Sequence, residues 1–169
     1  SQAFDINDPG QVVGVFSNRA TLFSSGGIVD LGSLYGQFSH SSAVAINNAG
    51  WAVGHSEASE SERATLFRDG LAIDLGTLGG NSRATDINGS GWIVGHSEKA
   101  VGIEEFRNTP FLWTERDGMV ALEDLIDPSS GWQLSQDEDA SPIINDAGQI
   151  VVKAFNPLVG DRLLLLTLS

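Results

Sequence analysis

Two histidines in matching sequence contexts are the first residues that could do chemistry. His55 and His96 each stand in a Gly-His-Ser triplet. Imidazole nitrogens bind zinc, so a zinc site shared between neighbouring repeats is one interpretation. The first and last repeats have no histidine at the corresponding position, so this set supplies only two ligands. We therefore expect structural histidines and assign no metal ligand.

The same triplets place a serine beside each histidine. Adjacent side chains on a strand point to opposite faces, so Ser56 cannot act with His55 as a nucleophilic pair. The Gly-Gly pairs at 26–27 and 79–80 lack the lysine and the following helix of a phosphate-binding loop. We therefore assign no catalytic residue.

Aromatic and acidic side chains gather in two long segments without strand character. Tyr35 and Phe38 lie in the first segment, and Trp132, Asp137 and Asp139 lie in the second. If both segments share one face of the protein, they form an aromatic platform beside carboxylates. That composition is typical of a surface that binds a sugar or a peptide. The alternative is that these rings cover the edges of sheets.

The elements that position these residues follow a pattern that the chain repeats four times. An Ile-Asn pair precedes two further residues, a glycine and a short apolar run, and successive pairs lie 40, 41 and 57 residues apart. A period near 40 residues is typical of stacked or radial repeat folds. We divide this single repeat domain into units at about 3–42, 43–82, 83–140 and 141–169.

Each unit is expected to contain consecutive antiparallel strands. Short apolar runs are broken by Gly, Asn, Asp and Ser about every 8–12 residues, and no helical period appears. We predict an all-β fold, a β-propeller built from four repeats of about 40–57 residues with four short strands each, the last repeat having only three. A β-solenoid is the structural alternative, although its repeats are usually shorter and lack hairpin turns.

The long third interval contains two insertions, at 98–108 and 127–140. Insertions in repeat proteins are usually loops and often lie on a binding face. We therefore expect both to be loops.

The recurring polar residues are expected to be structural. The asparagines of the Ile-Asn pairs should cap turns with their side chains; they are Asn7, Asn47, Asn88 and Asn145. Asp30 and Asp74 each open an Asp-Leu-Gly run and should accept hydrogen bonds from loop amides or pair with arginines of a neighbouring strand. Calcium is the alternative partner for these carboxylates. No calcium-binding motif is present, so we expect no cofactor.

The composition restricts the class of partner. The formal net charge is −13, from 22 acidic and 9 basic side chains, which argues against nucleic acid and anionic membranes. The longest apolar run, 163–166, is far shorter than a membrane span. The chain contains no cysteine, and it begins Ser-Gln-Ala with no signal peptide in view, so a removed leader stays open.

The repeated motif resembles that of a known family. The stretch DLGTLGGNSRATDIN at 74–88, followed by GWIVGHS at 91–97, is similar to the motif of the HAF repeat family of extracellular bacterial proteins. A weaker copy covers 30–47, and 131–152 looks like the ending of such proteins. The resemblance implies an extracellular or cell-surface location and supplies no catalytic residues.

These observations favour a non-catalytic extracellular module that serves as a binding or structural scaffold, for surface polysaccharide or for protein partners. The alternative is a secreted carbohydrate-active lyase or hydrolase that uses loop carboxylates at 104–105 and 137–139. An incomplete last repeat would also leave an open sheet edge, through which a homodimer can form.

Overall fold

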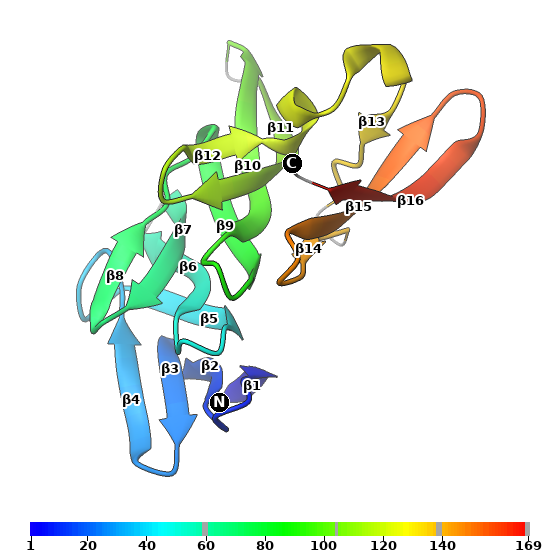
Figure 1. The fold of residues 1–169 in the computed structure, drawn as a ribbon. Helices are drawn as coiled ribbons and strands as arrows, with labels where there is room; N and C mark the ends of the chain where they lie inside the picture. The colour runs from blue at the N-terminus through cyan, green and yellow to red at the C-terminus, as the bar shows by residue number, and fades with distance from the viewer. Residues whose placement is uncertain (59–60, 104, 138–139, 168–169) are drawn as a thin grey trace.

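The computed structural model describes residues 1–58, 61–103, 105–137 and 140–167, and its strands form four four-stranded antiparallel sheets (Figure 1). Each sheet comes from one consecutive stretch of chain, which we call units 1 to 4. The all-β class predicted from the sequence is confirmed. No helix in the described ranges is long and apolar enough to cross a membrane.

The first three units are plain meanders in which each strand pairs with the next. Unit 1 contains β1 (Gln2–Ile6), β2 (Val12–Phe16), β3 (Arg19–Ser24) and β4 (Gly27–Gly32). Unit 2 contains β5 (His40–Ile46), β6 (Ala52–Ala58), β7 (Ser61–Arg68) and β8 (Leu71–Asp74). Unit 3 contains β9 (Gly79–Ile87), β10 (Ile93–Gly102), β11 (Glu105–Thr114) and β12 (Gly118–Ala121).

Unit 4 departs from this plan. Its strands are β13 (Gln133–Leu134), β14 (Ile143–Ile144), β15 (Gln149–Asn156) and β16 (Gly160–Thr167). β16 pairs with β15 along its whole length, so β13 and β14 share the other side of β15. The prediction of three strands was therefore wrong, because the insertion at 127–140 supplies β13. Within the described ranges β16 pairs only with β15.

The other insertion is not a loop either. Residues 98–102 and 105–108 continue β10 and β11 as a long hairpin, in which Lys99 pairs with Arg107 and Ala100 with Phe106. The prediction of a loop was wrong because the inserted residues on the two sides can keep the ladder of backbone hydrogen bonds. The rest of the chain between unit 3 and β13 forms two single-turn 3-10 helices, at Leu122–Leu125 and Pro128–Ser130.

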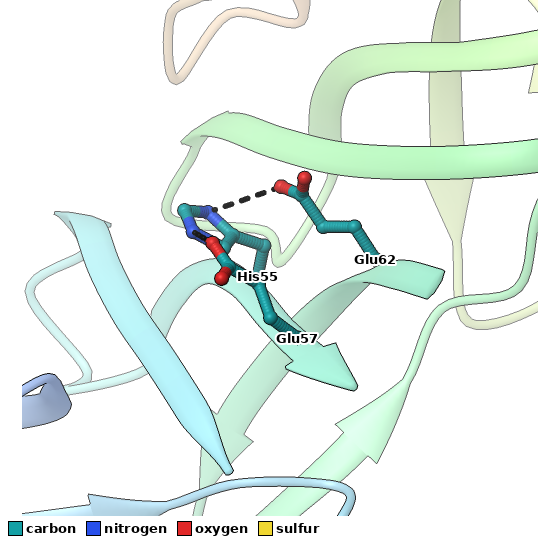
Figure 2. Close-up of side chains that lie close together, drawn as sticks. All are labelled: His55, Glu57 and Glu62. Carbon is teal, nitrogen blue, oxygen red and sulfur yellow. Dashed lines mark ion pairs between the residues drawn. The ribbon is translucent and has the colours of Figure 1, made fainter. Parts of the chain in front are cut away.

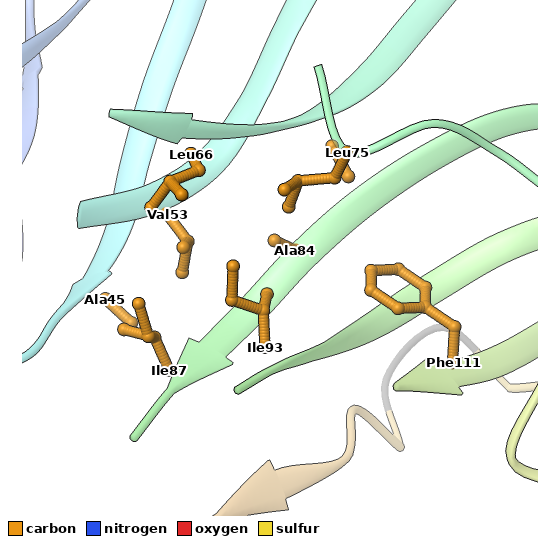
Figure 3. Close-up of a cluster of buried hydrophobic side chains, with 9 residues drawn as sticks. Ala45, Val53, Leu66, Leu75, Ala84, Ile87, Ile93 and Phe111 are labelled. Carbon is orange, nitrogen blue, oxygen red and sulfur yellow. The ribbon is translucent and has the colours of Figure 1, made fainter. Parts of the chain in front are cut away.

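The hydrophobic core lies between consecutive units. One cluster joins units 1 and 2, a second joins units 2 and 3 (Figure 3), and a third joins units 3 and 4. In the second cluster, Val53 and Leu66 of unit 2 pack with Ile93 of unit 3, and all three side chains are essentially inaccessible. Burying one such side chain contributes about 1.5–3 kcal/mol. Each sheet is therefore stabilised mainly by its neighbours in the chain.

The asparagines of the Ile-Asn pairs link these units at their turns. Asn47 Oδ1 accepts hydrogen bonds from the backbone amides of Ala49 and Trp51, which closes the turn of its own unit. Its Nδ2 donates to the carbonyl oxygen of Asn88 in the next unit, at 3.1 Å. Asn7 and Asn88 make the equivalent bonds to the units that follow them, at 3.0 and 3.1 Å. One side chain therefore both caps a turn and joins two sheets.

The residue just before the second strand in each of units 1 to 3 lies against the turn glycine of the next unit. A Cβ at Gly91 would stand 2.7 Å from the ring of Trp51, and a Cβ at Gly148 would stand 2.9 Å from the ring of Trp92. Gly91 also has a φ of 78°, which other residues adopt at a cost. The glycine is therefore required both by the turn and by the ring that covers it.

A second recurring glycine marks a close approach inside each sheet. A Cβ at Gly54 would stand 2.0 Å from the carbonyl oxygen of Ser42, and Gly14 and Gly95 face their own first strands in the same way. A register shift between Ala43 and Ala45 presses the first strand against this point. Unit 4 has Val152 at the equivalent position, where the first strand is interrupted between β13 and β14.

Candidate functional site

The insertion at 127–140 lies beside β15 and the β10–β11 hairpin and encloses a pocket of about 440 Å³. The pocket is lined by aromatic, amide and charged side chains, among them Arg107, Glu123, Trp132, Gln133, Asp137 and Phe155. It therefore combines an apolar ring surface with groups that can donate and accept hydrogen bonds.

Local turn chemistry positions the indole of Trp132. Asp127 Oδ1 accepts hydrogen bonds from the backbone amide and the hydroxyl of Ser129, both at 2.8 Å, which starts the second 3-10 helix. Gly131 then takes a left-handed φ of 72° and reverses the chain. The backbone continues directly into β13, where Gln133 pairs with Phe155. Trp132 is therefore held between a capped turn and a paired strand, and its side chain is only partly exposed.

Two carboxylates of the pocket, those of Glu123 and Asp137, are paired with cations. The Arg107 guanidinium donates to both carboxylate oxygens of Glu123 at 2.6 Å, and Lys99 Nζ donates to the same group at 2.8 Å. Lys153 Nζ donates to Asp137 Oδ2 at 2.9 Å. The hydrogen bond from Lys153, assisted by Ser135, lowers the pKa of Asp137 below that of a free aspartate. Asp137 is therefore an ionised acceptor at neutral pH.

The structure separates the two aromatic segments that the sequence suggested as one platform. Trp132 and Asp137 line the same pocket, whereas Tyr35 and Phe38 do not contribute to it. Tyr35 Oη lies 3.4 Å from Ser61 Oγ of unit 2, and the ring of Phe38 is 92% exposed. Asp139 lies outside the described residues.

A second hollow of about 370 Å³ lies near the hairpin ends of units 2 and 3. It is lined mainly by polar groups, including His55, Glu62, Arg83, His96, Glu98 and Asn108. Figure 2 shows that the carboxylates of Glu57 and Glu62 approach the imidazole of His55 from two sides, 3.3 Å from Nε2 and 3.6 Å from Nδ1. One ligand atom from each of the three residues lies within 4.8 Å of the others.

This trio has donors that suit a divalent cation, but its charges are also balanced within the protein. The Arg83 guanidinium pairs with the Glu62 carboxylate through Nε and Nη2. Burial is the largest influence on His55 and lowers its pKa, while Glu62 opposes that shift. The imidazole is therefore neutral at pH 7. Because a cation would have to displace Arg83 from Glu62, we assign no metal to the trio.

The repeated Gly-His-Ser triplet associated His55 with His96 and did not indicate Glu57 or Glu62. The missed signal was the alternation of a strand: His55 and Glu57 are two residues apart on β6 and so share a face. Glu57 also pairs in register with Glu62 across the β6–β7 hairpin. Only the register of β6 against β7, which no local pattern specifies, would have revealed that pairing.

Asp30 and Asp74 lie near the ends of the fourth strands of their units, β4 and β8, outside these two pockets. Asp30 Oδ1 accepts the backbone amide of Gly32 at 2.8 Å, and Asp74 Oδ1 accepts that of Gly76 at the same distance. Arg19 Nε also donates to Asp30 at 3.2 Å. Each carboxylate therefore shapes the exit from the fourth strand of its unit.

Comparisons with protein-family models, with curated proteins and with solved structures give no match.

Proposed function

We propose that this protein is a non-catalytic extracellular binding module of the HAF repeat type, and that the Trp132 pocket binds a saccharide unit of a surface polysaccharide. The observation that carries the proposal is the lining of that pocket. Trp132 and Phe155 stand beside the Asp137 carboxylate, amide side chains and the Arg107–Glu123 ion pair. Aromatic faces stack on the apolar faces of sugar rings, and fixed polar groups select hydroxyls.

The electrostatics favour binding over hydrolysis or elimination. A glycosidase needs one carboxyl group with a raised pKa to protonate the leaving oxygen. Asp137 has a lowered pKa, and Glu123 is held by two cations. Both groups suit the role of fixed hydrogen-bond acceptors. A secreted lyase or hydrolase therefore remains the weaker of the two proposals.

We also propose that the four sheets are successive blades of a propeller-type array. Their consecutive order, the apolar clusters between them and the asparagine links at their turns support this arrangement. In this arrangement the irregular segments after unit 3 are free to vary around a repeated core, as binding segments commonly do.

The function is tested by calorimetry and a glycan array with purified chain. We expect Trp132→Ala to weaken binding of the selected glycan at least about tenfold, as loss of a stacking ring at a binding centre does. Phe38→Ala is the matched control, because it removes an exposed ring outside the pocket, and should leave the affinity unchanged. Loss of binding in the control alone would place the site in the Tyr35–Phe38 segment. Release of new chain ends from the glycan would instead support an enzyme.

A further inference from the structure

The two outer faces of the array expose apolar side chains at positions that are buried inside it. We call the side of a unit that packs on the preceding unit its entry face, and the side that packs on the following unit its exit face. On the entry face, Ile6 of unit 1 is 63% exposed, whereas its counterpart in unit 2, Ile46, is 6% exposed. Ile28, on the fourth strand of unit 1, is also largely exposed.

The exit face of unit 4 shows the same contrast. Leu165 is 59% and Leu163 is 74% exposed, whereas their counterparts in unit 2, Leu66 and Ala64, are essentially buried. Leu163 also borders, with Ile143, an open hollow of about 660 Å³. In Figure 1 the first sheet lies at the bottom of the array and the fourth at the upper right, so the two faces do not cover each other.

The turns at these faces carry complementary hydrogen-bonding groups. Asn7 Nδ2 donates both to Gln11 Oε1 at 2.8 Å and to the carbonyl oxygen of Asn47 at 3.0 Å. Asn145 Nδ2 makes the first of these bonds, to Gln149 Oε1 at 2.8 Å, and unit 4 is the last unit that the structure describes. The matching acceptor is the carbonyl oxygen of Asn7, because Asn47, Asn88 and Asn145 each receive that bond from the unit before.

The glycines repeat this complementarity. The side chain of Gln11 lies 3.2 Å from the point where a Cβ of Gly50 would stand. Among the described residues, nothing beyond its chain neighbours lies within 4 Å of the same point at Gly10. Gln149 is the counterpart of Gln11 on the exit face of unit 4, so it fits over Gly10 of another copy.

The backbone amide of Ile6 on the entry face already has a hydrogen-bond acceptor within its own unit. At the interface between units 2 and 3, Ala45 of unit 2 has no side-chain acceptor. The backbone amide of Ile87 in unit 3 instead donates to the side chain of its chain neighbour Asp86 at 2.9 Å. The backbone amide of Ile6 on the entry face of unit 1 likewise donates to Asp5 at 2.8 Å. In unit 4, Ile143 occupies the position of Ala45 and also has no side-chain acceptor. At this position, contact between unit 4 and unit 1 would resemble the interface between units 2 and 3. At the other two interfaces the amides of Ile46 and Ile144 bond to Asp5 and Asp86 of the preceding unit.

We propose that the exit face of unit 4 binds the entry face of unit 1 of a second copy of this chain. The contact is head-to-tail, so it joins copies into a ring or an open row rather than a two-fold dimer. Its basis is continuity with the three interfaces inside the chain. It does not depend on saccharide binding in the Trp132 pocket.

The experiment is analytical ultracentrifugation of the chain and of two face variants. We expect the wild-type chain to associate with rising concentration. Ile6→Glu on the entry face and Leu165→Glu on the exit face should each reduce self-association at least about tenfold, since a buried unpaired carboxylate opposes contact. A mixture of the two variants should form a species of twice the chain mass, because each retains the face that the other lacks. Ile103→Glu, at an exposed site on the β10–β11 hairpin, is the matched control and should associate like the wild type.

Three outcomes would overturn the proposal. A wild-type chain that stays monomeric up to about 1 mM would mean that these faces serve another occupant, such as further repeats of a longer protein. A mixture of variants that stays monomeric would exclude the head-to-tail geometry. Association that survives Ile6→Glu would indicate pairing of open β16 edges. Circular dichroism of each variant establishes that it is folded, and glycan binding is measured separately.

Discussion

The asparagine links between units provide a sharp test of how the array is stabilised. The side chain of Asn47 is buried, and its oxygen and nitrogen make different hydrogen bonds. Oδ1 caps its own turn, and Nδ2 donates to the Asn88 carbonyl oxygen of the next unit. Asn47→Asp keeps the acceptor and replaces the donor with a carboxylate oxygen. The substitution therefore leaves the cap in place and breaks the bond between the units.

The expected cost follows from the hydrogen bond that the substitution removes. The Asn88 carbonyl loses its inter-unit donor but still accepts the backbone amide of Gly91 at 3.0 Å, so the lost hydrogen bond costs about 0.5–1.5 kcal/mol. The carboxylate must also leave water beside that carbonyl, which adds to the cost. We therefore expect Asn47→Asp to lower the free energy of unfolding by about 2–4 kcal/mol at pH 7. With a urea dependence of about 2 kcal/mol per M, the midpoint should fall by about 1–2 M.

Asn145→Asp is the matched control. Asn145 Oδ1 caps its turn through the Gln149 amide at 2.9 Å, as Asn47 does in unit 2, but its Nδ2 bonds only within its own exposed turn. An exposed change of this kind should cost at most about 0.5 kcal/mol. Urea unfolding is followed by tryptophan fluorescence and by circular dichroism, at concentrations where the chain is monomeric. Agreement between the two signals establishes a single transition, which repeat arrays do not always show.

Equal losses in the two variants would refute this reasoning. They would mean that the change from amide to carboxylate at the turn itself sets the cost and that the bond between units adds nothing. A negligible loss for Asn47→Asp would refute it as well, because the carboxylate would then have to be hydrated at a position that the structure buries.

Two further predictions concern the packing and the pocket histidine. Gly91→Ala should lower the free energy of unfolding by about 2–4 kcal/mol in thermal or urea unfolding, since it combines a left-handed φ with a clash against Trp51. The control is Gly10→Ala, which has nearly the same φ but open space around the new methyl group and should cost only about 1 kcal/mol. In NMR titration, His55 should have a pKa below the ordinary value near 6.5 because it is buried, and Arg83→Gln should raise that pKa because the Arg83 charge lowers it. Because folding lowers the pKa of His55, its contribution to stability is fully present above about pH 6.5 and is lost as the pH falls through the folded pKa. A His55 pKa that Arg83→Gln leaves unchanged would contradict the placement of Arg83 beside this imidazole.

The repeated turns were the part of the fold that the sequence predicted best. An Ile-Asn pair followed by a glycine specifies a local hairpin turn, and local chemistry of this kind can be read without knowing the rest of the structure. The all-β class and the four-stranded sheets of units 1 to 3 followed from it. The packing of one sheet against the next did not, because it depends on packing angles between units that no local pattern encodes.

The insertions were the part that the sequence predicted least well. The segment 98–108 contains no short apolar run, yet it extends a hairpin, since ladder hydrogen bonds on each side continue from strands already paired. Gln133 and Leu134 form a strand only because β14 leaves the end of β15 without a partner. In both cases the structure of the insertion is imposed by the strands beside it.

The difference between the repeated turns and the insertions also explains where the candidate site lies. Each repeated position serves a contact between units: the asparagine joins two turns, and the tryptophan covers a glycine. Side chains committed in this way are not available for a ligand. Trp132 and Asp137 belong to an insertion with no counterpart in units 1 and 2, so the inter-unit contacts place no such constraint on them. The binding site that we propose, the Trp132 pocket, therefore lies where the period of the array is broken.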